Sequence, residues 1–553
     1  MSFFNRLTVL LLFAASLCFS AEKYWIFFKD KGPQNPEGLQ KAQAELSPRA
    51  LQRRAKVMHP LTDPTDLPVY SGYTEKLKSL GIEPIVTSKW LNAVSARVES
   101  DQLREIRSLP FVDKVQPVLR GRHRPQPEEA TALSKRQVAG DAPIDYGASY
   151  IQNAMIRVPE VHALGLTGEG VIVALMDAGF SVKHPVFQHM NILAKRDFIN
   201  NDDEVDQQPG DPYGQHDHGT KVLSILGGYA PGYLIGPAFG ATFILAKTED
   251  ISSETPVEED YWIAAAEWAE GLGADVFNTS LGYIDWYTYA DMNGRTAPIT
   301  IAADLAVQKG VVVVCSAGNE GNSPWRYITA PADGFGVIAV GAVGADSVIA
   351  GFSSRGPTSD GRIKPDVVAL GVGATSAQSS GSGYTTGSGT SFSSPLVAGA
   401  AALILQAHPH LTPLQVRQAL LQTANRAASP DNVYGFGLVN ALAAVNYWGP
   451  VGNPAEETRF LSFYPNPFSP QAHGGSSKFV FDLKEPAPAQ IDLYNLRGQL
   501  LGRIVDVRLP ATRAASVSWD GRAPNGIPLP SGVYFCRIRI GEKEQMTKIT
   551  LLR

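Results

Sequence analysis

One serine stands where a protein could use it as a nucleophile. Residues 389–403 read GTSFSSPLVAGAAAL, and Ser391 comes just before an alanine-rich run that favours a helix. The N-terminus of a helix carries partial positive charge and free N–H groups, so a hydroxyl held there suits an attack that creates an oxyanion. Gly387 and Gly389 allow the tight backbone that this position needs. The alternative is that Ser391 only caps the helix, as serine commonly does.

A nucleophilic serine needs a base, an acid that orients the base, and a second donor for the oxyanion. Asp177 ends the apolar run VIVALMD, His218 lies in QHDHGTK, and Asn319 follows the apolar run VVVVCSAG. Taken singly, these residues also have ordinary interpretations as a turn aspartate, a loop histidine and a turn asparagine. Together with Ser391 they follow the order Asp, His, Asn and Ser, which is hard to attribute to chance.

The sequence around these four residues resembles the subtilisin-like serine protease family. Three motifs carry the resemblance: an Asp-x-Gly turn at 177–179, an HGT motif at 218–220 and GTSFSSPLVAG at 389–399. NTSLG, SAGNEG and VIAVGAV…FSSRGP also match family core segments, and the resemblance covers roughly residues 146–445. The departures from the family pattern remove no catalytic group: Ala178 replaces Ser or Thr, Lys221 replaces a second histidine, and Phe392 replaces methionine.

The resemblance implies a mechanism and a set of site residues. His218 would take the proton from Ser391 and give it to the leaving amine, while Asp177 would hold the imidazole in the required tautomer. Asn319 and the backbone N–H of Ser391 would form the oxyanion hole. An extended substrate would pair with a strand edge. The expected substrate-binding residues are Ser280, Leu281, Gly282, Ser316, Ala317 and Gly318.

The main alternative belongs to a different functional class. A catalytically inactive relative could act as a surface-binding or adhesion protein. All four catalytic positions are occupied, however, which favours the enzyme. We therefore expect a secreted serine endopeptidase that works through an acyl-enzyme and is made as a self-processing zymogen. Its partners would be polypeptide substrates and its own propeptide.

Alternating strand and helix patterns indicate how these residues come together. Between residues 144 and 449, buried apolar runs alternate with helical segments. This order predicts an α/β domain with a subtilisin-like parallel sheet and helices on both faces. In such sheets, ligands bind beyond the carboxyl ends of the strands. Asp177, residues 278–282 and residues 316–319 all follow predicted strands, so we expect them at one edge of the sheet.

The first 20 residues have the pattern of a secretory signal peptide. Arg6 supplies positive charge, residues 7–17 form a short apolar core, and Cys18 and Ser20 are small residues before a cut. The apolar run is shorter than the roughly 20 residues that a spanning helix needs, which disfavours a membrane anchor. The residues before Cys18 fit a lipoprotein signal poorly. No later segment is expected to span a membrane.

The segment before the enzyme predicts an inhibitory domain. Residues 21–120 combine strand and helix patterns, including strand-like alternation at 88–98, and indicate a compact α+β domain. WLNAVSARV and FVDKVQPV make this domain resemble the propeptide of the family. Residues 121–143 are polar, contain proline and lack any pattern, so they predict an exposed linker that carries the processing site.

The segment after the enzyme predicts a β-sandwich. A linker at 450–460 leads to residues 461–553, where short strands alternate with frequent turns. YPNPF, IDLYNLRG and SGVYF resemble a C-terminal sorting domain of type IX secretion or a related Ig-like domain. This resemblance implies a secretion machinery as partner and a secreted or cell-surface location. A passive accessory domain is the alternative.

Composition excludes some classes of partner and cofactor. The 553-residue chain has a formal net charge of −5 and no basic tract, which argues against nucleic acid. Three widely spaced cysteines predict no disulfide framework. His216 and His218 form an H-x-H pair, but no cysteine or acidic residue has metal-site spacing, so we expect no metal or other cofactor in the chemistry. The acidic run 201–211 could hold structural calcium, although a solvated loop is favoured.

Overall fold

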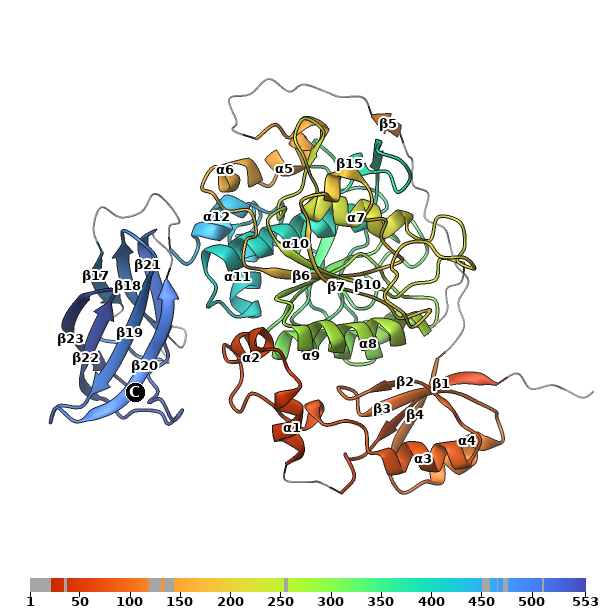
Figure 1. The fold of residues 1–553 in the computed structure, drawn as a ribbon, viewed down its shortest axis with the longest axis horizontal. Helices are drawn as coiled ribbons and strands as arrows, with labels where there is room; N and C mark the ends of the chain where they lie inside the picture. The colour runs from red at the N-terminus through yellow and green to blue at the C-terminus, as the bar shows by residue number, and fades with distance from the viewer. Residues whose placement is uncertain are drawn as a thin grey trace, which may run out of the picture.

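Three structural units follow one another along the chain: an α+β domain, an α/β domain and a β domain (Figure 1). The predicted signal peptide lies outside the described residues, as do most of the linkers 121–143 and 450–460. The computed structural model describes residues 21–33, 37–118, 131–133, 144–252, 257–449, 458–464, 466–470, 476–509 and 512–553.

A seven-stranded parallel sheet forms the centre of the α/β domain, as the sequence predicts. Its inner strands are buried on both faces, which is why they consist of continuous apolar runs. The strand order is β14 (Val367–Leu370), β13 (Ile338–Val343), β12 (Val312–Ser316), β11 (Val276–Thr279), β6 (Ile172–Asp177), β10 (Thr242–Lys247) and β7 (Asn191–Asp197).

Helices cover both faces of this sheet. One face packs against α7 (Asp217–Gly227) and α10 (Thr390–Ala407). The other face packs against α8 (Val257–Leu272) and α9 (Pro298–Gln308). Figure 1 shows the two pairs on opposite sides of β6. Among the described helices, α10 alone has the length and hydropathy of a membrane span, and it is the buried core helix of this domain.

The alternation of side chains along β6 explains the two cores. Val173 and Leu175 belong to the apolar core on the side of α7 and α10, whereas Ala174 and Met176 belong to the core on the side of α8 and α9.

The domain is completed by η2 (Gly147–Ser149), α5 (Tyr150–Ala154), α6 (Val158–His162), η3 (Pro185–Phe187), η4 (Tyr289–Asp291), α11 (Pro413–Thr423), α12 (Ala441–Asn446), the hairpin β8 (Tyr229–Ala230) and β9 (Leu234–Ile235), and the strands β15 (Ala374–Ala377), β16 (Tyr384–Gly387) and β5 (Thr131–Leu133).

The N-terminal domain is a four-stranded antiparallel sheet with two helices on one face. Its strands lie in the order β2 (Pro84–Ser88), β3 (Ala93–Val98), β1 (Glu22–Phe28) and β4 (Val112–Val118). The helices are α3 (Ser71–Ser79) and α4 (Gln102–Ser108). Between β1 and α3 the chain inserts α1 (Gly38–Ala44), α2 (Pro48–Arg54) and η1 (Pro64–Asp66), which we call the arm, residues 38–66.

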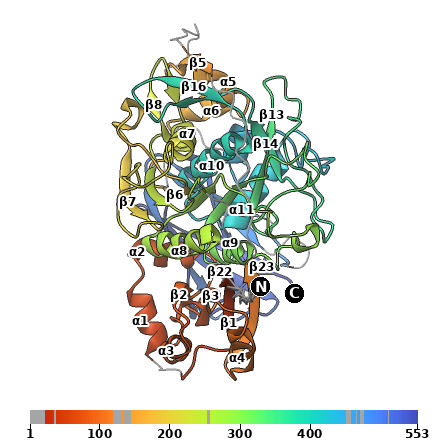
Figure 2. The same ribbon diagram turned by 90° about the vertical axis from the view of Figure 1, so that its right-hand side faces the viewer.

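The other face of this sheet packs against the enzyme domain. Trp25 and Trp90 are buried in the core that contains α8 and α9, and Figure 2 shows the N-terminal domain directly below these helices.

The strand predicted at residues 88–98 was wrong in detail. Residues 88–98 do not form a single strand, because Lys89–Asn92 make a turn. The turn bends there because the Glu267 carboxylate of α8 accepts the backbone N–H of Trp90 at 3.1 Å and the hydroxyl of Ser88 at 2.6 Å.

The C-terminal domain consists of two antiparallel sheets around an apolar core, in agreement with the predicted β-sandwich. Cys536 is buried in this core and Cys315 in the enzyme domain, and both are free thiols. The first sheet contains β17 (Arg459–Tyr464), β18 (Ser477–Leu483) and β21 (Thr512–Trp519), and the second contains β20 (Leu500–Leu509), β19 (Ala487–Tyr494), β22 (Gly532–Ile540) and β23 (Lys543–Leu551).

Candidate active site

Asp177 and His218 are joined by a hydrogen bond at the carboxyl end of the sheet. Asp177 is the last residue of β6 and is fully buried, and its Oδ1 lies 2.7 Å from Nδ1 of His218. His218 lies in the first turn of α7, which can approach β6 because residue 219 is glycine. A Cβ atom at Gly219 would lie 2.2 Å from the carbonyl oxygen of Gly179. With Nδ1–H bound to the carboxylate, Nε2 becomes the basic nitrogen of His218.

Ser391 is the second residue of α10 and is almost completely buried. Its hydroxyl donates a hydrogen bond of 3.0 Å to the backbone carbonyl of Ser280, and the Ser280 hydroxyl donates one of 3.0 Å to the carbonyl of Ser391. The neighbouring Phe392 ring lies 6.4 Å from the His218 ring, measured between centroids. The structure thus brings the helix that carries the predicted nucleophile beside the predicted base, although the two residues are far apart in the sequence.

Asn319 lies beside the start of α10, with its amide held in one orientation. Its Oδ1 accepts the backbone N–H of Thr390 at 2.8 Å and the Thr390 hydroxyl at 3.0 Å. Both groups are donors, so the oxygen must face Thr390, and the Nδ2 donor is turned the other way. Thr390 was not among the predicted site residues. The GTS tripeptide signalled its position beside Ser391, but not its contact with Asn319.

The six predicted substrate-binding residues form two neighbouring segments at the carboxyl ends of β11 and β12. Between them lies Thr329, which was not among the predicted site residues. A Cβ atom at Gly282 would lie 2.2 Å from Thr329 Oγ1, and one at Gly318 would lie 2.6 Å from Thr329 Cγ2. The two glycines therefore leave the space that the Thr329 side chain occupies.

Thr329 is tied to both segments through the backbone. Its N–H donates to the carbonyl of Ala317 at 3.1 Å, and the N–H of Tyr283 donates to the carbonyl of Ala330 at 2.9 Å. Its Oγ1 is buried and has no hydrogen-bond partner in the described part of the chain. The Thr329 side chain thus fills the space between the two segments with its methyl group and with a hydroxyl that has no partner among the described residues.

The acidic run 201–211, considered for calcium from the sequence, lies beside a buried lysine. Lys247 Nζ is 2.8 Å from Asp197 Oδ2 and 2.6 Å from Asp211 Oδ2, and the ammonium is fully buried. Burial alone would favour the neutral amine, but the bonds to the two carboxylates raise the pKa of Lys247. An internal ammonium therefore neutralises these two carboxylates. Among the described residues, no group of three or more His, Cys, Asp or Glu side chains is placed to hold a metal ion.

The two histidines of the H-x-H pair bind different carboxylates. His216 Nδ1 lies 2.6 Å from Asp206 Oδ1, whereas His218 bonds to Asp177. The Nδ1 atoms of the two histidines therefore bond to different aspartates.

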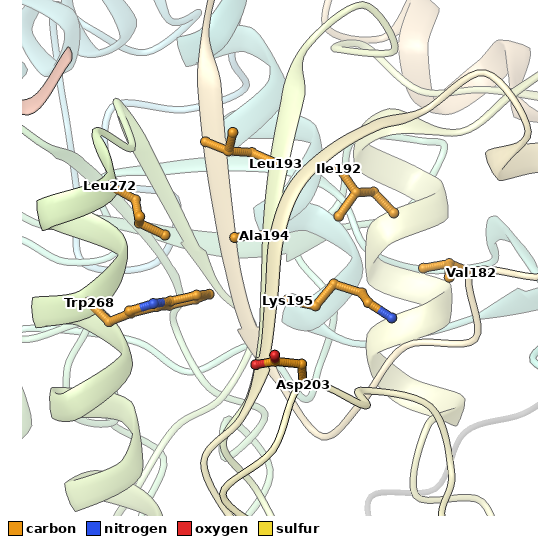
Figure 3. A pocket seen from close by; sticks show the side chains of 8 residues that line it. All are labelled: Val182, Ile192, Leu193, Ala194, Lys195, Asp203, Trp268 and Leu272. Carbon is orange, nitrogen blue, oxygen red and sulfur yellow. The ribbon is translucent and has the colours of Figure 1, made fainter. Parts of the chain in front are cut away.

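A cavity of about 570 Å³ opens along the edge strand β7 and beside α8 (Figure 3). It contains none of the residues predicted for catalysis or substrate binding, and apolar side chains make up most of its wall. We therefore place the chemistry at the carboxyl ends of β6, β11 and β12 and not in this cavity. Its lining residues are Val182, Ile192, Leu193, Ala194, Lys195, Asp203, Trp268 and Leu272.

Two family models match the chain. The model of the Subtilase family (Peptidase S8) matches residues 168–437, which include Asp177, His218, Asn319 and Ser391. The model of the Peptidase S8 propeptide domain of Bacteroidota matches residues 23–132. The second match contains the N-terminal domain and ends later than residue 120, the boundary predicted from the sequence.

Characterised proteases of several bacteria are similar over this region. Subtilisin E of Bacillus subtilis (strain 168) is 33% identical over 357 residues, which cover 64% of this chain and 81% of that protein. Subtilisin of Bacillus pumilus is 35% identical over 302 residues, or 54% of this chain and 98% of that protein. Serine protease AprX of Bacillus subtilis (strain 168) is 34% identical over 311 residues, or 51% of this chain and 67% of that protein.

Proposed function

Because the chain belongs to the subtilase family and is a serine endopeptidase with a propeptide domain, we propose that Asp177, His218 and Ser391 are its catalytic triad. We also propose that it is made as a self-processing zymogen for export. The observation that carries the triad is the bonded pair Asp177–His218, whose imidazole lies beside the first turn of α10.

The resting position of the Ser391 hydroxyl indicates how the reaction starts. A hydroxyl has one proton, and that of Ser391 is donated to the carbonyl of Ser280. Oγ must therefore turn away from this carbonyl before His218 can accept the proton. An extended peptide can cause this turn, because its own backbone N–H can donate to the Ser280 carbonyl instead. Substrate binding would then release the nucleophile toward its base.

The chemistry follows from the donors and acceptors around Ser391. Oγ attacks the scissile carbonyl while Nε2 of His218 takes its proton, and Asp177 stabilises the imidazolium. The oxyanion accepts hydrogen bonds from Nδ2 of Asn319 and the N–H of Ser391. His218 then protonates the leaving amine as the peptide C–N bond breaks, which leaves an acyl-enzyme. Water attacks the ester with His218 as base, releasing the acid and restoring Ser391.

These side chains and backbone groups supply the nucleophile, the base and the oxyanion donors. Hydrolysis therefore needs no cofactor under this proposal, and a structural calcium site is not assigned. Ser316, Leu281 and the other residues of the two segments at β11 and β12 would bind the extended substrate, with Thr329 between the two segments.

A serine-directed fluorophosphonate probe tests the assignment of the nucleophile. The mature enzyme should be labelled at Ser391 and should lose peptide cleavage in proportion to labelling. The Ser393→Ala variant is a matched control, because Ser393 lies on the same helix but donates only to the carbonyl of Thr390. Labelling at another serine, or full activity of the labelled enzyme, would reject the assignment.

The zymogen proposal is supported by the position of the N-terminal domain on α8 and α9. We infer that Ser391 cuts the linker 121–143, because a tethered segment has a high effective concentration near the active site. The Ser391→Ala precursor, purified away from other proteases, should stay uncut, whereas the wild type should yield a mature N-terminus between Gly121 and Tyr146. Processing of the purified variant at the same bond would exclude self-cleavage.

Export is the remaining part of the proposal. Residues 1–20 would direct the chain across the inner membrane, and the C-terminal β domain would direct it onward to the outside or to the cell surface. Deleting residues 461–553 should leave the enzyme in the periplasm of the native host, measured by fractionation and immunoblot. Secretion of the truncated chain at the normal level would favour the passive accessory domain instead.

A further inference from the structure

The arm of the N-terminal domain touches the enzyme far from the cleft. It reaches the end of α8 that lies opposite to the Lys23–Asp260 ion pair, which joins β1 to the first turn of this helix. The contact begins at Ser47, the N-cap residue of α2, whose N–H donates to the carbonyl of Gly271 at 3.0 Å. The arm thus binds where α8 ends, a place at which helix carbonyls lack partners within the helix.

Arg53 of the arm bonds the C-terminal ends of both α8 and α9. Its Nη1 donates to the carbonyl of Ala274 at 2.6 Å, and Nη2 donates to the carbonyl of Glu270 at 3.1 Å. Its Nε donates to the carbonyl of Lys309, the C-cap residue of α9, at 3.2 Å. A guanidinium is a favourable partner for these carbonyls, because the C-terminal end of a helix carries partial negative charge. The Arg53 side chain is only 1% exposed.

Arg54 uses all five of its N–H groups in this interface. Nε and Nη2 donate to the two carboxylate oxygens of Glu270 at 2.8 and 2.7 Å, and Nη1 and Nη2 donate to the two oxygens of Asp66 at 2.9 Å each. The fifth N–H donates to the carbonyl of Leu61 at 3.0 Å. Lys309 of the enzyme in turn donates to Asp66 at 3.0 Å. The charges therefore alternate across the boundary between the two domains.

Two glycines let the arm come this close. Gly273 and Gly310 follow the ends of α8 and α9 with φ of +103° and +96°, a conformation that favours glycine after a helix. A Cβ atom at Gly273 would lie 2.7 Å from Cβ and Cγ of Arg49, and one at Gly310 would lie 3.1 Å from Cγ of Arg53. Because neither position carries a Cβ atom, α2 can pack closely against the ends of α8 and α9.

The Glu270 carboxylate receives its described hydrogen bonds from the arm alone, through Arg53 and Arg54. It is fully buried while the arm is bound. When one partner of a buried ion pair is removed by mutation, the loss of stability is large, because the other charge stays buried without compensation. Departure of the arm instead returns both groups to water, so the pair contributes to domain association and not to the fold of the enzyme itself.

We propose that the C-terminal ends of α8 and α9, with Glu270 at their centre, form a docking site on the mature protease for the arginine-pair helix of its own propeptide. This site is an anchor separate from the cleft and from the sheet contacts at Asp260 and Glu267. It holds the propeptide on the enzyme after the linker has been cut, and so sets the rate at which activity appears. The inference rests on the proposed zymogen, because it needs a cut between propeptide and enzyme.

The first test measures how fast the cut propeptide leaves. Full-length wild type, Glu270→Gln and Arg53→Gln/Arg54→Gln chains are allowed to process, and the complexes are isolated by size exclusion. After dilution, propeptide release is followed by a second size-exclusion run and by the onset of peptide cleavage. Glu270→Gln and the double variant should release the propeptide at least about tenfold faster than wild type, with the same final activity.

The control is Arg104→Gln, which removes an exposed arginine of α4 in the same domain. It should release the propeptide at the wild-type rate. If Glu270→Gln releases it no faster than this control, the docking site is overturned, while final activity in the same samples still reports on the protease itself. Glu270→Gln leaves the propeptide sequence unchanged, so a folding defect of the arginine variants does not affect this comparison.

The second test does not depend on activity or processing. Hydrogen exchange is measured on the uncut Ser391→Ala chain with and without Glu270→Gln. The substitution should speed exchange in residues 47–66 at least about tenfold, while β1 and β3 keep their protection. Unchanged exchange in residues 47–66 would overturn the proposal, even for a chain that never processes.

Discussion

The carbonyl of Ser280 and the hydroxyl of Ser391 lie 3.0 Å apart, and the hydroxyl of Ser280 returns a bond of the same length to the carbonyl of Ser391. This reciprocal pair ties the segment after β11 to the first turn of α10. It therefore holds the residues that would bind substrate in a constant position relative to Ser391, which would attack the substrate. The pair also gives the nucleophile a resting acceptor other than its base.

Removing a triad residue should abolish turnover without unfolding the enzyme. Ser391→Ala and His218→Ala are each expected to lose peptide cleavage, and the double variant should be no worse than either one, because the residues act as a unit. Asn319→Ala removes one oxyanion donor and should lower kcat by about 100- to 1,000-fold. These effects are measured as kcat with a peptide substrate, with circular dichroism as the folding control. Near-normal turnover by either purified triad variant would contradict the mechanism.

Thr329 should set the size of the substrate side chain that fits between the segments after β11 and β12. Thr329→Gly removes the group between Gly282 and Gly318 and should raise kcat/KM for substrates with a large aromatic side chain relative to small ones. A gain of roughly 10- to 200-fold in this ratio corresponds to filling an apolar pocket with about 1–3 kcal/mol of binding energy.

Thr329→Val is the matched control for shape, because it keeps the volume and removes only the unpartnered hydroxyl. It should leave the preference for side-chain size unchanged. If Thr329→Gly and Thr329→Val cleave a peptide mixture with the same preference as wild type, Thr329 does not limit the substrate side chain that binds between the two segments.

Replacing Lys247 with methionine should destabilise the enzyme domain. The change leaves the fully buried Asp197 and the partly buried Asp211 without their ammonium, and breaking a buried pair from one side costs about 3–5 kcal/mol. Urea unfolding of the Ser391→Ala chain, which cannot digest itself under our proposal, measures the loss. The control Lys183→Met removes an exposed ammonium that pairs with Asp206 and should change the unfolding free energy little. Equal stability of the two variants would contradict the role of Lys247.

The loss of unfolding free energy caused by Lys247→Met should depend on pH. Burial alone would raise the pKa of Asp211, but the bond to Lys247 lowers it below its usual value. A carboxyl with a lowered pKa in the folded state stabilises the fold above its unfolded pKa near 3.9 and loses that contribution as pH falls. The difference between wild type and variant should therefore be full at pH 7 and shrink below about pH 4. A deficit that grows on acidification would show that the pairing energy is assigned wrongly.

Phe392 should make the active site resistant to oxidation. Its ring lies beside His218, at the position where the family resemblance implies a methionine, and it has no thioether to oxidise. Dilute hydrogen peroxide should leave the wild-type rate unchanged. Phe392→Met should start with activity of the same order and lose it on treatment, with sulfoxide at residue 392 seen by mass spectrometry. Equal peroxide sensitivity of both proteins would mean that another residue controls inactivation.

The sequence by itself determined the parallel-sheet fold and the four residues now proposed for catalysis. Asp177 and Asn319 follow apolar strand runs, and Ser391 precedes a helical run. Each therefore stands in a short local motif whose pattern is independent of the rest of the chain. Parallel strands present their carboxyl ends at one edge, so residues that follow different strands were expected to meet. The parallel pairing of β11 with β12, in which Thr279 lies opposite Cys315, brings residues 280–282 and 317–319 side by side and agrees with that expectation.

Only the tertiary structure decided which distant groups complete these motifs. Thr329 fits between the segments after β11 and β12 because Gly282 and Gly318 leave space for it. Lys247 neutralises Asp211 of the acidic run 201–211 together with Asp197, a pairing that the sequence did not indicate. In the sequence, Arg53 and Arg54 are typical of the exposed face of a charged helix. In the structure, Arg53 donates to backbone carbonyls at the ends of α8 and α9, and both arginines bond to the Glu270 carboxylate. The physical reason is the same in each case. Burial, ion pairing and close backbone approach depend on the distance between segments, and no periodicity along one segment encodes that distance.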